Sequence, residues 1–122
     1  IYIMKKLIIF SSILFTCLAN GQDISCNDLL DFITEEAYEE DSVGSIRLMD
    51  SSWLNGVEAY SYDGNLFVIA NIKSDEISYR NKEYIYCGVP EENWKKFSTY
   101  KLNKSYGEDF HEYIMDYQCN CY

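Results

Sequence analysis

The sequence predicts an α+β domain in which one helix precedes a small antiparallel β-meander and two helices follow it. Apolar residues recur at helical spacing within 24–40, alternate with polar residues between positions 57 and 86, and return to helical spacing after Pro90. The chain has 122 residues, and 16% of all residues are aromatic. This length and composition suit one domain with an apolar core, and they exclude a disordered or collagen-like chain.

The first helix is predicted over residues 24–40. Ser25 and Asp28 have the S-x-x-D spacing of a helix start. One face of this helix is apolar, and its residues are Cys26, Leu29, Leu30, Ile33 and Ala37. The acidic residues of the segment lie off that face, as expected for a side exposed to solvent.

The sheet and the C-terminal helices follow from turn and helix-start patterns. Strands at 57–62 and 66–72 flank Asp63-Gly64-Asn65, which is a typical hairpin turn, and a third strand is expected over 77–86 with an interruption near 80–82. Pro90 suits the first turn of a helix. The last helix is expected over 110–117, after a polar link at 103–107.

Residues 1–21 have the pattern of a secretory signal peptide. A short basic segment begins at Met4, and the apolar run at 7–18 is too short to cross a hydrocarbon core of about 30 Å. Small residues three and one positions before Gln22 suit cleavage there. We therefore expect a secreted or periplasmic protein without a transmembrane span after cleavage, and the alternative is a lipid anchor at Cys17.

The charge of the chain bears on its partners. The net charge is −10, and it becomes −12 when residues 1–21 are removed, because Lys5 and Lys6 leave with no acidic residue. Nucleic acid and anionic membranes are therefore not expected as partners. The basic residues cluster only within 95–104, as Lys95, Lys96, Lys101 and Lys104. No cofactor motif is present, so no cofactor is expected.

Four cysteines remain after residue 21, at positions 26, 87, 119 and 121. An even number in a small exported domain predicts two disulfides. A bond between Cys119 and Cys121 would close a strained ring, so we expect Cys26 and Cys87 each to pair with one of them, in either combination. A zinc site that also uses His111 is the alternative. Because C-x-C is tighter than the usual zinc-ligand spacing, no metal is expected.

Several short motifs occur in an order that resembles the KTSC domain, a small module found at the C-terminus of some lysyl-tRNA synthetases and also alone in bacteria. In sequence order they are Ser51-Ser52-Trp53-Leu54, the strand at 57–62, Tyr84-Ile85-Tyr86, Gly88-Val89-Pro90, and Ser105-Tyr106-Gly107 with Phe110, Ile114 and Tyr117. The resemblance covers residues 48–117. Together with the signal-peptide pattern, the resemblance implies a division of the chain into a signal peptide (1–21), a helical extension (22–42) and a KTSC-like domain (43–122).

The function of the KTSC family is unknown, and the RNA binding suggested for it conflicts with the acidity of this chain. We expect a non-catalytic module that binds a protein or peptide through a sheet edge or a tyrosine-bearing face. The candidate ligand face consists of Ser51, Ser52, Tyr84, Tyr86, Ser105, Gly107 and Phe110. The alternative is a small hydrolase or lyase that uses His111 with a nearby carboxylate. The sequence leaves the ligand and the oligomeric state open.

Overall fold

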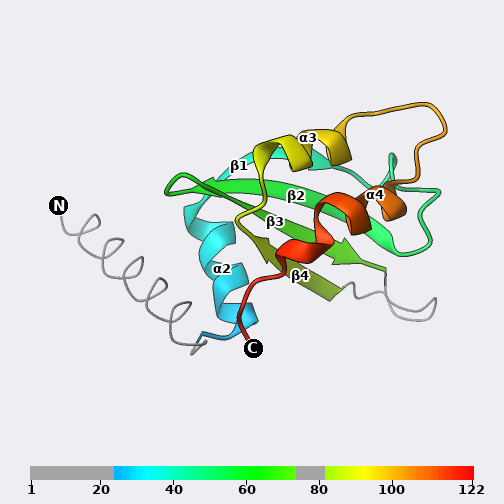
Figure 1. Cartoon of the computed structure of the whole chain (residues 1–122). Coiled ribbons are helices and arrows are strands. Elements are labelled where there is room, and N and C mark those ends of the chain that lie inside the picture. The colour runs from blue at the N-terminus through cyan, green and yellow to red at the C-terminus, as the bar shows by residue number, and fades with distance from the viewer. Residues whose placement is uncertain (1–23, 74–81) are drawn as a thin grey trace.

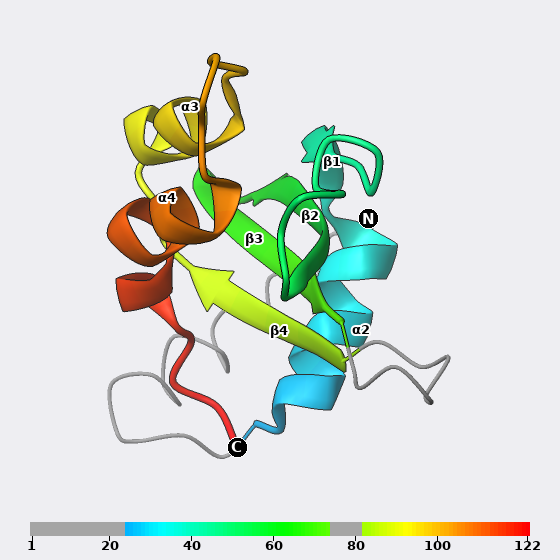
Figure 2. The ribbon, with the colours of Figure 1, turned by 90° about the vertical axis from the view of Figure 1, so that its right-hand side faces the viewer.

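The computed structural model describes residues 24–73 and 82–122, which form a four-stranded antiparallel sheet with helices on both faces. Helix α2 covers one face, and helices α3 and α4 cover the other (Figure 2). The strands lie side by side in chain order, β1-β2-β3-β4, so the predicted α+β meander is confirmed (Figure 1). The elements are α2 (Cys26–Glu36), β1 (Tyr38–Val43), β2 (Leu54–Tyr62), β3 (Asn65–Ile72), β4 (Lys82–Cys87), α3 (Glu91–Ser98), α4 (Tyr106–Tyr113) and the 3₁₀ turn η1 (Met115–Tyr117).

Helix α2 begins where the sequence predicts but is shorter. Its first turn is capped by Ser25, whose Oγ accepts a hydrogen bond of 3.0 Å from the backbone N–H of Asp28. The prediction of a helix as far as residue 40 is wrong, because α2 ends at Glu36 and Tyr38–Val43 is the edge strand β1. Beyond Ala37 the helical stripe would contain no further apolar side chain. As a strand, the same segment pairs its backbone with β2 and buries Val43.

The predicted hairpin between β2 and β3 is confirmed. Asp63 and Gly64 both adopt positive φ, 52° and 78°, as a tight two-residue turn requires. Strand β2 begins at Leu54, three residues before the predicted start, and β3 matches the prediction closely. Strand β4 begins at Lys82, and the remainder of the third predicted strand lies outside the described residues.

The sheet separates two apolar cores, because successive side chains of a strand point to opposite faces. On the α2 face, Leu29 and Ile33 pack against strand residues such as Ile69 and Ile85. The larger core lies between the sheet and the C-terminal helices. Its helical members are Trp94, Phe97, Tyr106 and Phe110, and they are joined by Ile114, which follows α4, and by the loop residue Leu48.

Both predicted C-terminal helices are present, but the last one begins earlier than predicted, at Tyr106 within the expected polar link. Pro90 lies at the N-cap of α3, and the Oγ of Ser105 caps α4 by accepting from the backbone N–H of Glu108 at 3.3 Å. The last predicted helix divides into α4 and η1, which together bring the C-terminal segment back along β4. There the backbone N–H of Cys119 donates to the carbonyl of Ile85 at 3.3 Å.

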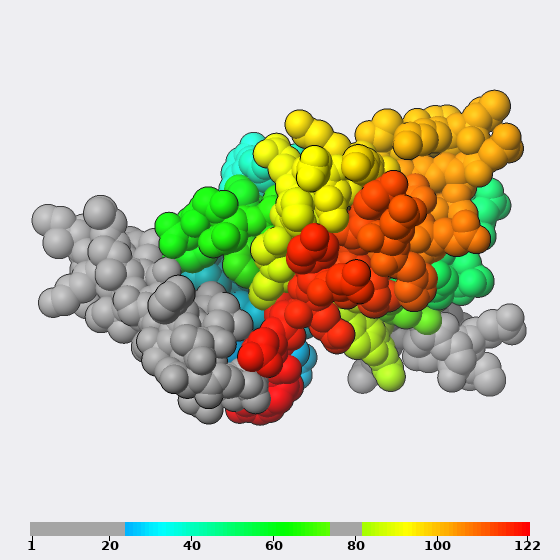
Figure 3. Space-filling model, viewed as in Figure 1, coloured from blue at the N-terminus to red at the C-terminus, as the bar shows by residue number. Residues whose placement is uncertain are grey.

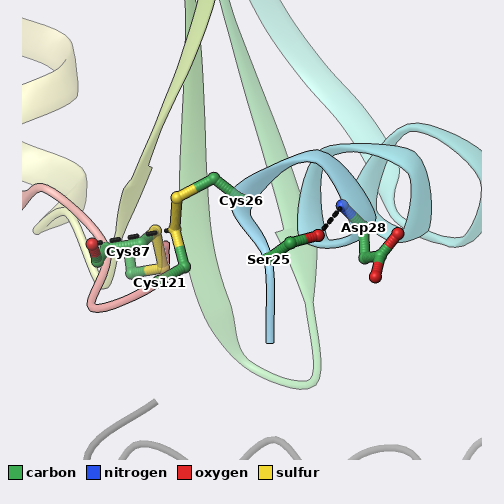
Figure 4. The surroundings of a disulfide bond; sticks show 6 residues. Ser25, Cys26, Asp28, Cys87 and Cys121 are labelled. Carbon is green, nitrogen blue, oxygen red and sulfur yellow. Dashed lines mark hydrogen bonds between the residues drawn. A yellow bond between two sulfur atoms is a disulfide. The ribbon is translucent and has the colours of Figure 1, made fainter. Parts of the chain in front are cut away.

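Two disulfides fasten this C-terminal segment and confirm the prediction of two bonds. Cys26 pairs with Cys121, and Cys87 pairs with Cys119, which selects one of the two combinations left open by the sequence. The first bond joins the start of α2 to the C-terminal tail and lies beside Cys87 (Figure 4). None of the described helices has the length and apolar character needed to cross a membrane.

Candidate functional site

A cleft with a volume of about 730 Å³ opens between the loop at residues 44–53 and the segment that joins α3 to α4. Both loops project at the same end of the molecule, away from the C-terminus (Figures 1 and 3). A cleft of this size falls in the usual range for ligand sites. It is lined by Arg47, Asp50, Ser51, Ser52, Trp53, Tyr100, Lys101, Leu102, Asn103, Lys104, Ser105, Tyr106, Gly107, Glu108 and His111.

Arg47 joins the two sides of the cleft. Its Nη2 and Nε donate to the hydroxyl of Tyr106 at 2.7 and 3.2 Å, and Nη2 also donates to the carbonyl of Ser98 at the end of α3. The first loop is thereby tied to both C-terminal helices. The guanidinium is engaged in holding the two walls together, which leaves less of its hydrogen-bonding capacity for a ligand.

Lys104 has a structural role in the second wall. Its side chain is 3% exposed, and its Nζ forms an ion pair of 3.3 Å with Asp109. The same Nζ donates to carbonyls in and just after the last turn of α3, those of Lys96 (3.0 Å), Phe97 and Thr99 (2.8 Å). Burial lowers the pKa of Lys104, and Asp109 opposes that shift. One of the four lysines in the predicted basic cluster is therefore withdrawn from the surface.

Trp53 is one of the aromatic residues that line the cleft. Its ring meets Phe110 edge-on, with centroids 5.4 Å apart, and lies 5.2 Å from the ring of His111. Gly107 in the first turn of α4 allows this approach, since a Cβ placed there would lie 2.6 Å from the indole Nε1. A glycine at position 107 therefore has a clear local reason in the packing of Trp53 against α4.

The structure brings together four of the seven residues predicted to form a ligand face. Ser51, Ser52, Ser105 and Gly107 line the cleft, although more than fifty residues separate the first pair from the second in sequence. The other three lie elsewhere.

Tyr86 and Phe110 are buried in the core, with ring centroids 5.2 Å apart. Burial, aided by the nearby Tyr84, raises the pKa of Tyr86 to about 12. Tyr84 is 39% exposed on the edge strand β4 and does not line the cleft. The two tyrosines share a face of the strand, as predicted, but only Tyr84 is exposed.

Two serines of the cleft retain unused hydrogen-bond donors. The Oγ of Ser51 accepts from the backbone N–H groups of Trp53 (3.3 Å) and Leu54 (3.0 Å), and the Oγ of Ser105 accepts from that of Glu108. Both hydroxyls therefore act as acceptors toward the protein, and within the described residues neither donates a hydrogen bond. Their O–H groups can serve a bound acceptor such as a carbonyl.

His111 lies in the lining of the cleft, as does Glu108. Among residues 24–73 and 82–122, however, no hydrogen bond or ion pair joins His111 to a carboxylate; its contact is with Trp53. A general base is normally oriented by such a partner. Nor do the described parts of the chain hold a group of three His, Cys, Asp or Glu side chains arranged for a metal ion.

Exposed apolar side chains occur on both of the loops that form the cleft. We use "rim" for four of them: Tyr100 and Leu102, which line the cleft and are 67% and 80% exposed, and Ile46 and Met49, which neighbour the lining residues Arg47 and Asp50 in sequence and are 82% and 72% exposed. Within the described ranges, these four are the majority of the seven large apolar side chains that are exposed. Exposed apolar side chains that line a cleft, such as Tyr100 and Leu102, are typical of a site of contact with another molecule.

Sequence analysis missed Arg47, the rim and the role of Trp53 in the lining. Hydrophobic residues in two loops, spaced without regularity and far apart in sequence, give no periodic pattern. The only available indication was the occurrence of apolar residues in segments that are otherwise polar, as in Tyr100-Lys101-Leu102-Asn103.

Searches of protein-family models, of curated proteins and of solved structures found no match to this chain.

Replacing Gly107 by alanine should displace Trp53 from the cleft wall. The added methyl would overlap the indole, at a cost of about 1–3 kcal/mol, against at most about 1 kcal/mol gained in helix propensity. We expect a net loss of roughly 1–2 kcal/mol in thermal or urea unfolding, together with a changed near-ultraviolet circular dichroism spectrum. Gly44→Ala is the matched control, because no atom lies within 4 Å of its added Cβ. Equal stability of the two variants would show that Trp53 is not held against α4.

Proposed function

We propose that this protein is an exported, non-catalytic binding module, and that the cleft between residues 44–53 and the α3–α4 segment is where it binds a partner protein. The rim supports this proposal, because two exposed apolar side chains, Tyr100 and Leu102, line the cleft and two more lie on its other loop, in an otherwise acidic chain. Export is supported by the sequence pattern of residues 1–21 and by the two disulfides, which are typical of small domains in oxidising compartments.

We further propose that residues 43–122 form a KTSC-like domain. In support, two motifs of that resemblance, Ser51-Ser52-Trp53 and Ser105-Tyr106-Gly107, meet at the cleft, where Trp53 packs on Gly107. The same motifs that suggest the family thus line the site that we propose for binding.

Site-specific photo-crosslinking tests the binding function. A photoreactive residue is placed at Leu102 or, as a control of similar exposure, at Tyr38 on β1, which is 70% exposed and lies outside the cleft. In the cells that make the protein, we expect covalent adducts from position 102 only. The adducts are identified by mass spectrometry, and the partner is then purified.

Binding of the purified partner completes the test. Leu102→Ala should weaken it about tenfold or more, as truncation of a central apolar contact does, and Tyr38→Ala should leave it unchanged. Adducts formed equally at both positions, or a partner that binds the Leu102→Ala variant normally, would argue against the cleft as the binding site.

A further inference from the structure

The two disulfides are nested in the order of the sequence. Of the four paired cysteines, the first bonds to the last and the second to the third, as Cys26–Cys121 and Cys87–Cys119. A chain exported from its N-terminal side therefore presents Cys26 and Cys87 to an oxidising compartment before the native partner of either. The bond that this order favours first is Cys26–Cys87, and the folded protein does not contain it.

The four cysteines are also neighbours in the fold. Cys87 lies beside the Cys26–Cys121 bond (Figure 4), and the sulfur of Cys121 is 3.8 Å from the carbonyl oxygen of Cys119. Cys119 belongs to the apolar cluster on the α2 face, and Cys87 and Cys121 pack against it. A bond between Cys26 and Cys87, or an exchange of partners between the two native bonds, therefore joins residues that already lie close together.

Backbone contacts distinguish the native pairing from these alternatives. The N–H of Cys119 donates to the carbonyl of Ile85, on the strand that carries its disulfide partner, at 3.3 Å. The N–H of Cys26 donates to the carbonyl of Tyr122, the residue after its own partner, at 2.6 Å. These contacts align each cysteine with its partner, so the native pairing is the one that forms when the bonds can exchange freely.

Wrong pairings are corrected by exchange, which begins with the attack of a thiolate on a disulfide. When Cys26–Cys119 and Cys87–Cys121 form, none of the four cysteines keeps a thiol, so the thiolate must come from another molecule. We propose that the protein reaches its native pairing by exchange with a dithiol enzyme of the Cys-x-x-Cys class, its folding partner in the compartment to which it is exported. This inference rests on the export that is part of the proposed function.

The same enzyme corrects a Cys26–Cys87 bond in steps that balance in atoms and electrons. A thiolate of the enzyme attacks the sulfur of Cys87, forms a mixed disulfide with it and releases the thiolate of Cys26. The thiolate of Cys119 then attacks the sulfur of Cys87, closes the native bond and returns the enzyme thiolate, so no electron is gained or lost. Cys26 and Cys121 finally transfer two electrons, with their two protons, to the disulfide form of the enzyme and close the second bond.

Oxidative refolding tests the inference. The purified protein is reduced and unfolded, and is then returned to native buffer with one of two oxidants. Diamide closes disulfides and provides no thiolate for exchange, whereas a mixture of reduced and oxidised glutathione does. Bonds are mapped by proteolysis without reduction and by mass spectrometry. We expect the native pairing in no more than about half of the diamide-treated molecules, because at least two unstrained connectivities compete, and in nearly all of the glutathione-treated ones.

A Cys-x-x-Cys isomerase added with glutathione to the diamide-treated protein should convert the non-native bonds faster than glutathione alone. The matched control is the double variant Cys87→Ser/Cys119→Ser, which keeps only Cys26 and Cys121 of the four, and both oxidants should close its bond equally well. Native pairing of the original protein with diamide alone, or a conversion that the isomerase does not accelerate, would overturn the proposal.

Failure of this inference and failure of the proposed function give different results. Four free thiols at these positions in the protein isolated from its cells would contradict export, and with it the folding partner, whatever the refolding shows. Native pairing with diamide alone would remove the need for a dithiol enzyme. It would leave export and the binding cleft supported, because those are measured by localisation and by crosslinks at position 102.

Discussion

Replacing Cys121 by serine should lower the free energy of unfolding by about 5 kcal/mol. The Cys26–Cys121 bond closes a sequence separation of 95 residues, and in the chain-entropy model a loop of that length restricts the unfolded chain by about this amount. The corresponding loss for Cys119→Ser is about 4 kcal/mol, since the Cys87–Cys119 bond closes only 32 residues. A domain of this size is stable by about 5–15 kcal/mol in total, so either loss is a large share of it.

Thermal unfolding and thiol mapping check this prediction together. The midpoint for Cys121→Ser should fall by on the order of 20 °C. One thiol should become free in each variant, that of Cys26 in Cys121→Ser and that of Cys87 in Cys119→Ser, as detected by alkylation without reduction and by peptide mapping. If Cys121→Ser instead leaves Cys87 as the free thiol, the pairing is the other combination.

Phe110→Ala should destabilise the protein by about 3–5 kcal/mol. The side chain is fully buried, and its ring meets those of Trp53, Tyr86 and Phe97 with centroids 5.2–5.6 Å apart. Truncation leaves a cavity where the sheet, the first loop and both C-terminal helices meet. Chemical denaturation should show a lower midpoint with a similar slope.

Two further variants provide reference values for this loss of stability. Phe110→Leu keeps most of the volume and should cost less than about 1.5 kcal/mol, whereas Glu112→Ala, at an exposed position of the same helix, should remain within about 0.5 kcal/mol of the original protein. A loss below about 1 kcal/mol for Phe110→Ala would mean that the residue is not part of the core. Phe110 would then again be a candidate for the ligand face.

Local patterns predicted the parts of the fold that local chemistry determines. The cap at Ser25, the turn at Asp63-Gly64 and the helix beginning after Pro90 all depend on residues within a few positions of one another. Strand β1 could not be found in this way. Its sequence, Tyr-Glu-Glu-Asp-Ser-Val, has acidic residues at positions that a helix would expose, and only pairing with β2 makes it a strand.

Acidic residues on an edge strand also have a physical use. Within the described residues, β1 is an edge strand of the sheet; backbone groups at such an edge can pair with another chain, and charged side chains there oppose such pairing. In addition, the indole N–H of Trp94 on α3 donates to the carboxylate of Asp41 at 3.0 Å. The periodicity of the sequence reveals neither the position of this strand at the sheet edge nor the hydrogen bond between Trp94 and Asp41. The segment therefore has the pattern of the exposed side of a helix.

The candidate site was predicted only in part, because contacts between segments that are far apart in sequence leave no local pattern. Ser51, Ser52, Ser105 and Gly107 were found through motifs, and the structure unites them. Phe110 and Tyr86 belong to the same motifs, but both are buried and pack in the core. Sequence alone does not distinguish a motif residue that packs in the core from one that binds a ligand. The rim depends on how two loops meet across Arg47, and no local spacing encodes that contact.

The Cys26–Cys121 bond also determines how the domain would bear mechanical force. The backbones of the two ends are already paired, with the N–H of Cys26 donating to the carbonyl of Tyr122 at 2.6 Å and that of Tyr122 to the carbonyl of Ile24 at 3.3 Å. Tension applied between residues 24 and 122 would extend only the few residues outside the disulfide. The load would then pass through a covalent bond, and neither the β-ladders nor the distant cleft would be stretched.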